Sequence, residues 1–224
     1  MTKKLYKYRF EIFLSIQLVI LFGSLFFPSE FYEQKLLPLF HLMSIASGVL
    51  MLSKKKKTMW FFIILFAIAS FIFGSDLVTR SENTDTILIR LSIYFVFHII
   101  VTFNIIQQVW KSKYVNQSVI AGLMSGYISL GFLAFFLFMS IELVHPGAFA
   151  GTLMENTDFT IRADGILYYA YITLLTIGYG EIVPVIPIAQ KAAILVGIVG
   201  QFYLVIITAV VIEKYIRHST SKEH

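Results

Sequence analysis

Six long apolar stretches constrain this chain of 224 residues more than any other feature of its sequence. Most of them approach or exceed the roughly 20 residues that an α-helix needs to cross a bilayer. They run from about Phe10 to Phe27, Leu36 to Leu52, Met59 to Phe73, Thr86 to Trp110, Val119 to Val144 and Ile188 to Tyr215. The sequence therefore predicts an all-α membrane protein with six transmembrane helices.

A seventh stretch, from about Gly165 to Leu175, is amphipathic and too short to cross a bilayer. It lies between the last two long stretches, so we expect a re-entrant helix there. Backbone that enters the membrane without crossing it is tolerated only where protein surrounds it and water lies at its end. Such a helix would place the loop that follows it close to a water-filled pathway.

The overall composition agrees with a membrane location. Hydrophobic residues make up 58% of the chain, 22 residues are Phe, and the mean hydropathy is +0.79. That leaves too little polar surface to cover a soluble globule of this size. The chain has no Cys, which excludes disulfides, iron–sulfur clusters and thiolate metal sites.

The basic residues predict how the helices are oriented. If both termini are cytoplasmic, 13 of the 18 Lys and Arg residues fall in inner segments, as the positive-inside rule requires. We therefore expect a multi-pass protein of the plasma membrane with both termini cytoplasmic. The inner set consists of Lys3, Lys4, Lys7, Arg9, Lys54, Lys55, Lys56, Lys57, Lys111, Lys113, Lys214, Arg217 and Lys222.

Charged residues on the two sides have different interpretations. The run Lys54, Lys55, Lys56 and Lys57 either binds anionic lipid headgroups or serves only as a topology anchor. Ten acids fall on the outer side, among them Glu155, Asp158 and Glu181, and an acidic outer mouth would concentrate cations. The net charge of +5 then belongs to the cytoplasmic face, and no nucleic-acid partner is expected.

The residues Thr176, Ile177, Gly178, Tyr179 and Gly180 form the sequence TIGYG just before the last apolar stretch. Consecutive backbone carbonyls can all face one axis only if the backbone alternates in handedness. L-residues tolerate that alternation poorly, whereas glycine tolerates it easily. Gly178 and Gly180 are suitably spaced for it.

This segment and its surroundings resemble the tetrameric potassium channels. Tyr168 to Leu175 resembles their pore helix, TIGYG resembles their selectivity filter, and Glu181 to Pro184 resembles the acid and proline that follow it. The resemblance covers roughly the last hundred residues. It implies a homotetrameric pore that conducts potassium passively.

The resemblance also implies roles for individual residues. Stacked sites for dehydrated potassium ions would be formed by the carbonyls of Thr176, Ile177, Gly178 and Tyr179 and by the Thr176 hydroxyl, with four chains completing each site. The ring of Tyr179 would turn away from the axis towards Tyr168 and Tyr169. An interfacial aromatic belt is an alternative explanation for these rings.

The last stretch contains candidate gating residues. Gly200 lies at the family's usual hinge distance after Gly180, and so resembles the point where the inner helix bends. Beyond it, Leu204, Thr208 and Ile212 recur at helical spacing and share one face. Four copies of that face would close the pore by excluding water, unless the face packs on the fifth helix instead.

The fifth stretch carries a strip of small residues of the kind that allows close helix packing. They are Gly122, Gly126, Gly131, Ser118 and Ser125.

The fourth stretch has a single basic residue, Arg90, where a voltage sensor has several. Moving four such charges through 100 mV supplies at most about 9 kcal/mol, whereas steep gating requires tens. We therefore expect little voltage dependence.

Two histidines, His41 and His98, fall within the predicted spans. They are either proton sensors or, as we favour, neutral imidazoles that are hydrogen-bonded between helices. Their position alone does not distinguish the two roles.

We predict two domains, a peripheral four-helix domain over residues 1–115 and a pore domain over residues 116–224.

No enzyme motif occurs, and no cofactor is expected apart from the permeant potassium ions. A potassium-selective channel is the leading interpretation. A weakly selective cation channel and a non-conducting membrane subunit are the alternatives.

Overall fold

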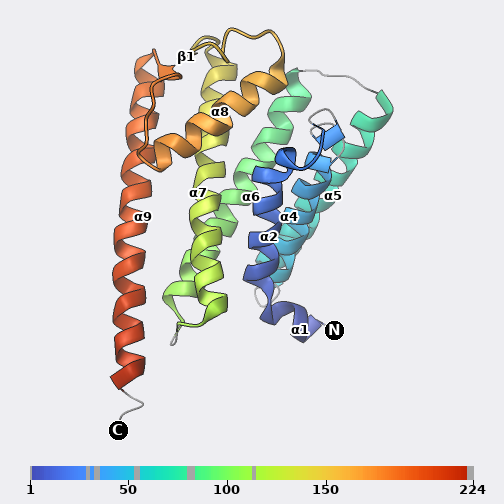
Figure 1. Cartoon of the computed structure of the whole chain (residues 1–224). Helices are drawn as coiled ribbons and strands as arrows, with labels where there is room; N and C mark the ends of the chain where they lie inside the picture. Colours follow the sequence, from blue (N-terminus) through green and yellow to red (C-terminus); the bar gives the residue numbers. More distant parts are fainter. Residues whose placement is uncertain are drawn as a thin grey trace. The chain divides into compact units, whose positions relative to one another are not determined.

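The computed structural model describes residues 2–28, 31–32, 36–52, 56–79, 84–112 and 115–220, and these are mostly helical (Figure 1). The elements in chain order are α1 (Thr2–Lys7), α2 (Arg9–Phe22), the 3-10 helix η1 (Gly23–Leu25), α4 (Leu37–Met51), α5 (Lys56–Thr79), α6 (Thr84–Trp110), α7 (Gln117–Val144), β1 (Phe149–Ala150), α8 (Phe159–Leu174), β2 (Val183–Pro184) and α9 (Pro187–Thr220).

Every predicted apolar stretch lies largely within a helix, but the helices differ in length. Among the described residues, three are long and apolar enough to cross a membrane, over Leu91–Trp110, Gln117–Val144 and Pro187–Lys214. Leu37–Met51 and Met59–Phe71 are shorter apolar helices, and α2 has 14 residues. The structure is thus that of a helical protein with three candidate spans, and six crossings remain a prediction.

The first helix ends earlier than its apolar run predicts. Helix α2 stops at Phe22 and continues into η1 instead of reaching Phe27. The hydroxyl of Tyr32 lies 2.5 Å from the carbonyl oxygen of Val19 and 2.9 Å from that of Ile20. A side chain from outside the helix thus contacts carbonyls in the last turn of α2, where the Val19 carbonyl also accepts the backbone N–H of Gly23.

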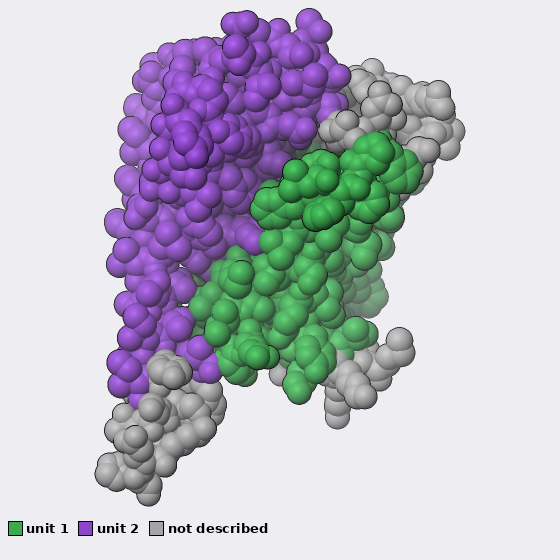
Figure 2. All heavy atoms as spheres, in the orientation of Figure 1, with its two compact units in different colours: residues 1–112, 116–126 green, residues 113–115, 127–224 purple. Residues whose placement is uncertain are grey.

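The chain forms two compact units, residues 1–112 with 116–126 and residues 113–115 with 127–224 (Figure 2). The division falls inside α7. In the first unit, α2 contacts α4, α4 contacts α5, and α5 contacts α6. Its core includes Phe13, Phe62 and Phe97, whose rings meet at centroid distances of 6.3 Å (Phe13 to Phe97) and 5.4 Å (Phe62 to Phe97).

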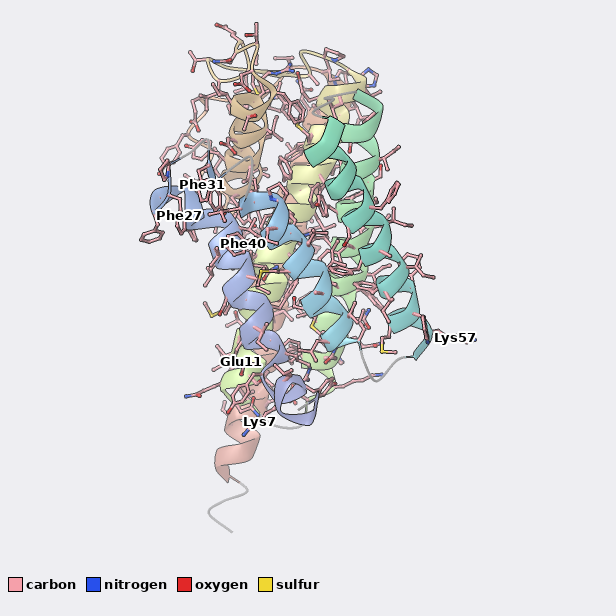
Figure 3. All side chains as sticks on the ribbon, turned by 90° about the vertical axis from the view of Figure 1, so that its right-hand side faces the viewer. Lys7, Glu11, Phe27, Phe31, Phe40 and Lys57 are labelled. Atoms are coloured by element: carbon pink, nitrogen blue, oxygen red, sulfur yellow. The ribbon has the colours of Figure 1, made fainter. Side chains whose placement is uncertain are left out.

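Figure 3 shows the two ends of the first unit. Lys7 and Lys57 lie at one end, and Phe27 and Phe31 lie towards the other. Two of the basic residues that were expected on the cytoplasmic side therefore share an end of this unit. Lys54 and Lys55 lie outside the described residues, and Lys57 is exposed.

The second unit contains α8, α9, most of α7 and a small antiparallel sheet that the sequence did not predict. In that sheet Phe149 pairs with Pro184 and Ala150 pairs with Val183. Because β1 follows α7 and β2 follows the TIGYG segment, the sheet joins the two loops at that end of the unit. The ring of Phe149 in β1 is buried against that of Phe138 in α7, with ring centroids 5.5 Å apart.

Candidate functional site

The site begins with α8, which starts at Phe159, six residues before the predicted Gly165. Asp158 is the N-cap, and its side chain accepts a hydrogen bond from the backbone N–H of Thr160 at 2.8 Å. Acidic N-caps of this kind satisfy backbone donors that have no partner in the first helical turn. The predicted first residue of the helix lay too far along the chain, because it was chosen from the apolar residues and not from the N-cap residue.

Two tyrosines fix the end of α8 against α7. The Tyr171 hydroxyl donates to the carbonyl of Ile128 at 2.8 Å, and the Tyr127 hydroxyl donates to the carbonyl of Leu174 at 3.2 Å. A Cβ added to Gly131 would come within 2.2 Å of the Tyr171 ring. Gly131 is therefore needed where Tyr171 packs, which confirms the packing interpretation of this glycine.

The backbone of the TIGYG segment alternates in handedness. Thr176, Gly178 and Gly180 have φ values of 58°, 59° and 93°, while Ile177 and Tyr179 between them have no positive φ. A Cβ added to Gly178 or Gly180 would meet nothing within 4 Å, so it is the φ angle, and not the available space, that favours glycine. Thr176 is β-branched and takes this conformation at a cost in strain.

Hydrogen bonds at the start of the segment hold this conformation. The Thr176 N–H donates to the carbonyl of Thr173 at 3.1 Å, and the Ile177 N–H donates to the carbonyl of Ile172 at 2.8 Å. Both acceptors lie in the last turns of α8. The helix end therefore supports the first two residues of the segment.

The segment lies at the surface of the single chain. All residues from Thr176 to Glu181 are exposed, and the exposed fractions are 46% for Ile177 and 73% for Tyr179. One chain therefore leaves the segment open on one side. Within the described residues, no group of three or more His, Cys, Asp or Glu side chains is placed to hold a metal ion.

The two tyrosines that were expected to support Tyr179 differ in their surroundings. Tyr169 is buried, with its ring centroid 5.1 Å from that of Phe138 and 5.3 Å from that of Phe149. It is thus part of the core of its own chain. Tyr168 is partly exposed, and a hydrogen bond to Glu181 raises the pKa of its hydroxyl to about 12.

Glu142 has a structural role that sequence reasoning missed. It is 5% exposed, and its carboxylate accepts hydrogen bonds from the N–H groups of Gly147 at 3.0 Å and Phe149 at 3.2 Å. Glu142 therefore fixes the turn that leads into β1. An acid at the end of an apolar helix, followed by the His-Pro-Gly turn, was the available signal.

Gly200 on α9 lies against the end of α8. A Cβ there would come within 2.6 Å of the Leu174 carbonyl oxygen, whereas a Cβ on Gly197 would meet nothing within 4 Å. Helix α9 is continuous through both glycines. Of these two glycines, Gly200 is therefore the one that packs closely within the chain.

The predicted gating face of α9 is open in the single chain. Leu204 and Ile212 are 42% and 52% exposed, and Thr208 is exposed as well. The face that packs on α7 is a different one, because the ring of Tyr203 lies 5.6 Å from that of Tyr127. Within this unit, Leu204, Thr208 and Ile212 therefore do not lie on the face that carries Tyr203.

A residue that was not singled out from the sequence, Gln201, reaches the TIGYG segment. Its side-chain Nε2 donates to the Thr176 hydroxyl oxygen at 3.2 Å. The only sequence signal was one amide within a long apolar helix. Gln201, Leu204, Thr208 and Ile212 share one helical face, at intervals of three and four residues.

In the first unit, the hydrogen bond of His41 lies within its own helix, α4, so hydrogen bonds of the two histidines between helices stay a prediction. His41 Nδ1 lies 2.9 Å from the carbonyl oxygen of Leu37, and its ring lies 4.7 Å from that of Tyr94. His98 is buried, with 1% exposed. The guanidinium of Arg9 donates to Gln108 at 2.9 Å. The side chain of Arg90 lies outside the described residues.

The small-residue strip at the start of α7 also packs closely. A Cβ on Gly122 would lie 3.1 Å from Val109 and 3.2 Å from Phe10. The hydroxyl of Ser125 is 2.8 Å from the carbonyl of Ala121 and 3.4 Å from that of Phe10. These contacts confirm the prediction that Gly122 and Ser125 serve packing.

Comparison with known proteins supports a channel interpretation of this region. A protein-family model described as "Ion channel" (Ion_trans_2) matches residues 128–217, which is less than half of the chain. No curated protein and no solved structure matched the chain. The matched range includes α8, the TIGYG segment and nearly all of α9, so this part of the protein is similar to an ion channel.

Proposed function

We propose that four copies of this chain form a potassium-selective channel. The observation that carries the proposal is the alternation of backbone handedness at Thr176, Gly178 and Gly180, within a range that matches an ion-channel family. Alternation of this kind lets consecutive carbonyls face one axis. A line of such carbonyls can replace the hydration shell of potassium.

The carbonyls of Thr176, Ile177, Gly178 and Tyr179 and the Thr176 hydroxyl are the proposed ion ligands, and Gly180 ends the line. The exposure of the segment in one chain supports assembly, because a single set of oxygens cannot surround an ion. The permeant ion is potassium itself, and the proposal requires no other cofactor.

The proposed membrane arrangement rests on the six apolar stretches of the sequence and on the three described helices that are long enough to cross. We propose six crossings, by α2, α4, α5, α6, α7 and α9, with both termini on the cytoplasmic side of the plasma membrane. Helix α2 spans only about 21 Å at 1.5 Å per residue, so the turns on either side of it complete its crossing. The location of Lys7 and Lys57 at one end of the first unit supports this orientation.

The outer mouth is proposed to attract cations. Glu181 directly follows the carbonyl line and is exposed, and Tyr168 hydrogen-bonds to it. An exposed carboxylate from each of four chains would raise the local potassium concentration. The acid therefore acts on the supply of ions and not on their dehydration.

Gating is proposed at α9. Four copies of the face formed by Leu204, Thr208 and Ile212 would line the inner pathway and close it by excluding water. The contact of Gly200 with Leu174 then joins the moving helix to the end of α8. The single Arg90 supports gating with little dependence on voltage.

Ion flux into liposomes tests the proposal. The purified protein is reconstituted, and uptake is compared in potassium and in sodium, with and without barium. We expect barium-sensitive uptake of potassium and much slower uptake of sodium. Equal uptake of the two ions would favour the weakly selective channel, and no uptake would favour the non-conducting subunit.

A further inference from the structure

Gln201 is the residue on α9 whose side chain touches the proposed filter. Its Nε2 lies 3.2 Å from the Thr176 hydroxyl oxygen, to which it donates a hydrogen bond. Both side chains are exposed in the single chain. The contact therefore lies on the open side of this unit, where the proposed pathway runs.

The backbone brings these two residues together. Gly200 lies so close to the end of α8 that a Cβ would be 2.6 Å from the Leu174 carbonyl oxygen. Leu174 precedes Thr176 by two residues, and Gln201 directly follows Gly200. The close approach of α9 to α8 therefore places the Gln201 amide next to Thr176, the first residue of the TIGYG segment.

The hydrogen bond constrains a group that would otherwise rotate. A threonine hydroxyl has one hydrogen to donate and two lone pairs to accept with, and its hydrogen turns to suit its partners. The Thr176 backbone N–H is already bonded to the Thr173 carbonyl. The amide of Gln201 occupies one lone pair of the hydroxyl oxygen, which leaves the other lone pair in a defined direction.

We propose that Gln201 is a positioning residue for the innermost ion site. Its carboxamide holds the Thr176 hydroxyl in place, so that the free lone pair of the oxygen faces the ion. This inference rests on the proposed function, in which that oxygen is an ion ligand. It adds that the affinity of the innermost site depends on a side chain of α9, the helix that carries the proposed gate.

Barium block of single-channel currents tests the proposal, because barium is a doubly charged ion that occupies dehydrated sites. Gln201→Met keeps the length of the side chain and removes the amide. Loss of one hydrogen bond of this kind should weaken barium block about fivefold, while potassium remains preferred over sodium. Leu195→Met is the matched control, since Leu195 is also exposed on α9 and lies about 9 Å along the helix from Gln201; its barium block should equal that of the wild type.

A second pair of variants tests whether the effect passes through the hydroxyl. Thr176→Ser retains the hydroxyl, so Gln201→Met should again weaken block about fivefold in that background. Thr176→Ala removes the hydroxyl, so Gln201→Met should add no further loss there. Equal fivefold losses in the Ala and Ser backgrounds would contradict the proposal.

Failure of this inference can be distinguished from failure of the proposed function. A potassium-selective wild type with unchanged barium block in Gln201→Met contradicts the role of Gln201 alone. A wild type that conducts sodium as well as potassium contradicts the proposed function instead. The reversal potential of the wild type is therefore measured first, on the same preparations.

Discussion

At the scale of single residues, two glycines of α9 differ in what surrounds them. Gly200 faces the Leu174 carbonyl oxygen, and Gly197 faces open space within the chain. Gly200→Ala should therefore destabilise the fold by about 1–3 kcal/mol through overpacking. Gly197→Ala, the matched control, should be neutral or stabilise by up to about 1 kcal/mol through its helix propensity.

Thermal unfolding of the purified protein in detergent measures both glycine variants. The expected order of melting temperatures places Gly200→Ala lowest. If the two variants melted together at the wild-type temperature, the close contact with Leu174 would be wrong.

The hydrogen bond between Tyr168 and Glu181 gives a pH dependence. It raises the pKa of Tyr168 to about 12, above the usual value of about 10. The neutral phenol is the form that the fold favours, so its contribution is complete below about pH 10 and is lost as the pH rises through 12. Below pH 10 the Tyr168 hydroxyl stays neutral, so it should not make the free energy of unfolding depend on pH.

A spectroscopic titration of tyrosinate checks this prediction. The difference between the wild type and Tyr168→Phe should show one tyrosine that titrates near pH 12. In Glu181→Gln that titration should move towards pH 10. If Tyr168 of the wild type titrated near pH 10, its hydrogen bond to Glu181 would not form.

At the scale of elements, the turn after α7 depends on one buried carboxylate. Glu142→Gln replaces an acceptor oxygen with an amide that faces a backbone N–H, either of Gly147 or of Phe149. Two buried donors that face each other without an acceptor should lower the free energy of unfolding by about 1–3 kcal/mol. Hydrogen exchange should show faster exchange of these two amides, and Glu155→Gln, at an exposed acid, should leave them protected.

The helices could be predicted from the sequence because long apolar runs in a bilayer satisfy their backbone hydrogen bonds within a helix. Their ends were less predictable. Helix α8 starts at its Asp158 cap, and α2 ends where Tyr32 reaches its carbonyls. Such ends depend on side-chain contacts and not on hydropathy, so the apolar pattern misplaced both of them by several residues.

The candidate site was predictable in part, for a related reason. Gly178 and Gly180 were recognised because glycine is the residue that adopts a positive φ easily. Thr176 adopts the same conformation, which its identity does not reveal. The contact of Gln201 with Thr176 was missed because the two residues are 25 positions apart in the sequence and meet only in the fold. The contacts of Glu142 are local, with Gly147 and Phe149, but an acid at a helix end does not reveal which backbone N–H groups it will bind.

At the scale of the whole molecule, α9 is too apolar to be left uncovered. Only 17% of its apolar segment within Pro187–Lys214 is buried in the chain. Phe202 and Val205 are 63% and 65% exposed. Apolar surface of this kind requires lipid or further protein against it. The proposed assembly of several chains around α9 would provide that cover and would also enclose the TIGYG segment.

Voltage dependence is a property of the whole assembly. With one basic residue in α6, Arg90, four subunits supply at most about 9 kcal/mol per 100 mV. The open probability should therefore change little with voltage, and Arg90→Gln should leave it unchanged. A steep activation curve that disappeared in Arg90→Gln would contradict this prediction.

The central claim is that backbone carbonyls of several chains select potassium, and the reversal potential between potassium and sodium tests it most directly. The purified protein is recorded in a planar bilayer with potassium on one side and sodium on the other. We predict a reversal potential far from zero, with the sign of a potassium-selective current. A reversal potential near zero, in a preparation that conducts, would contradict the claim.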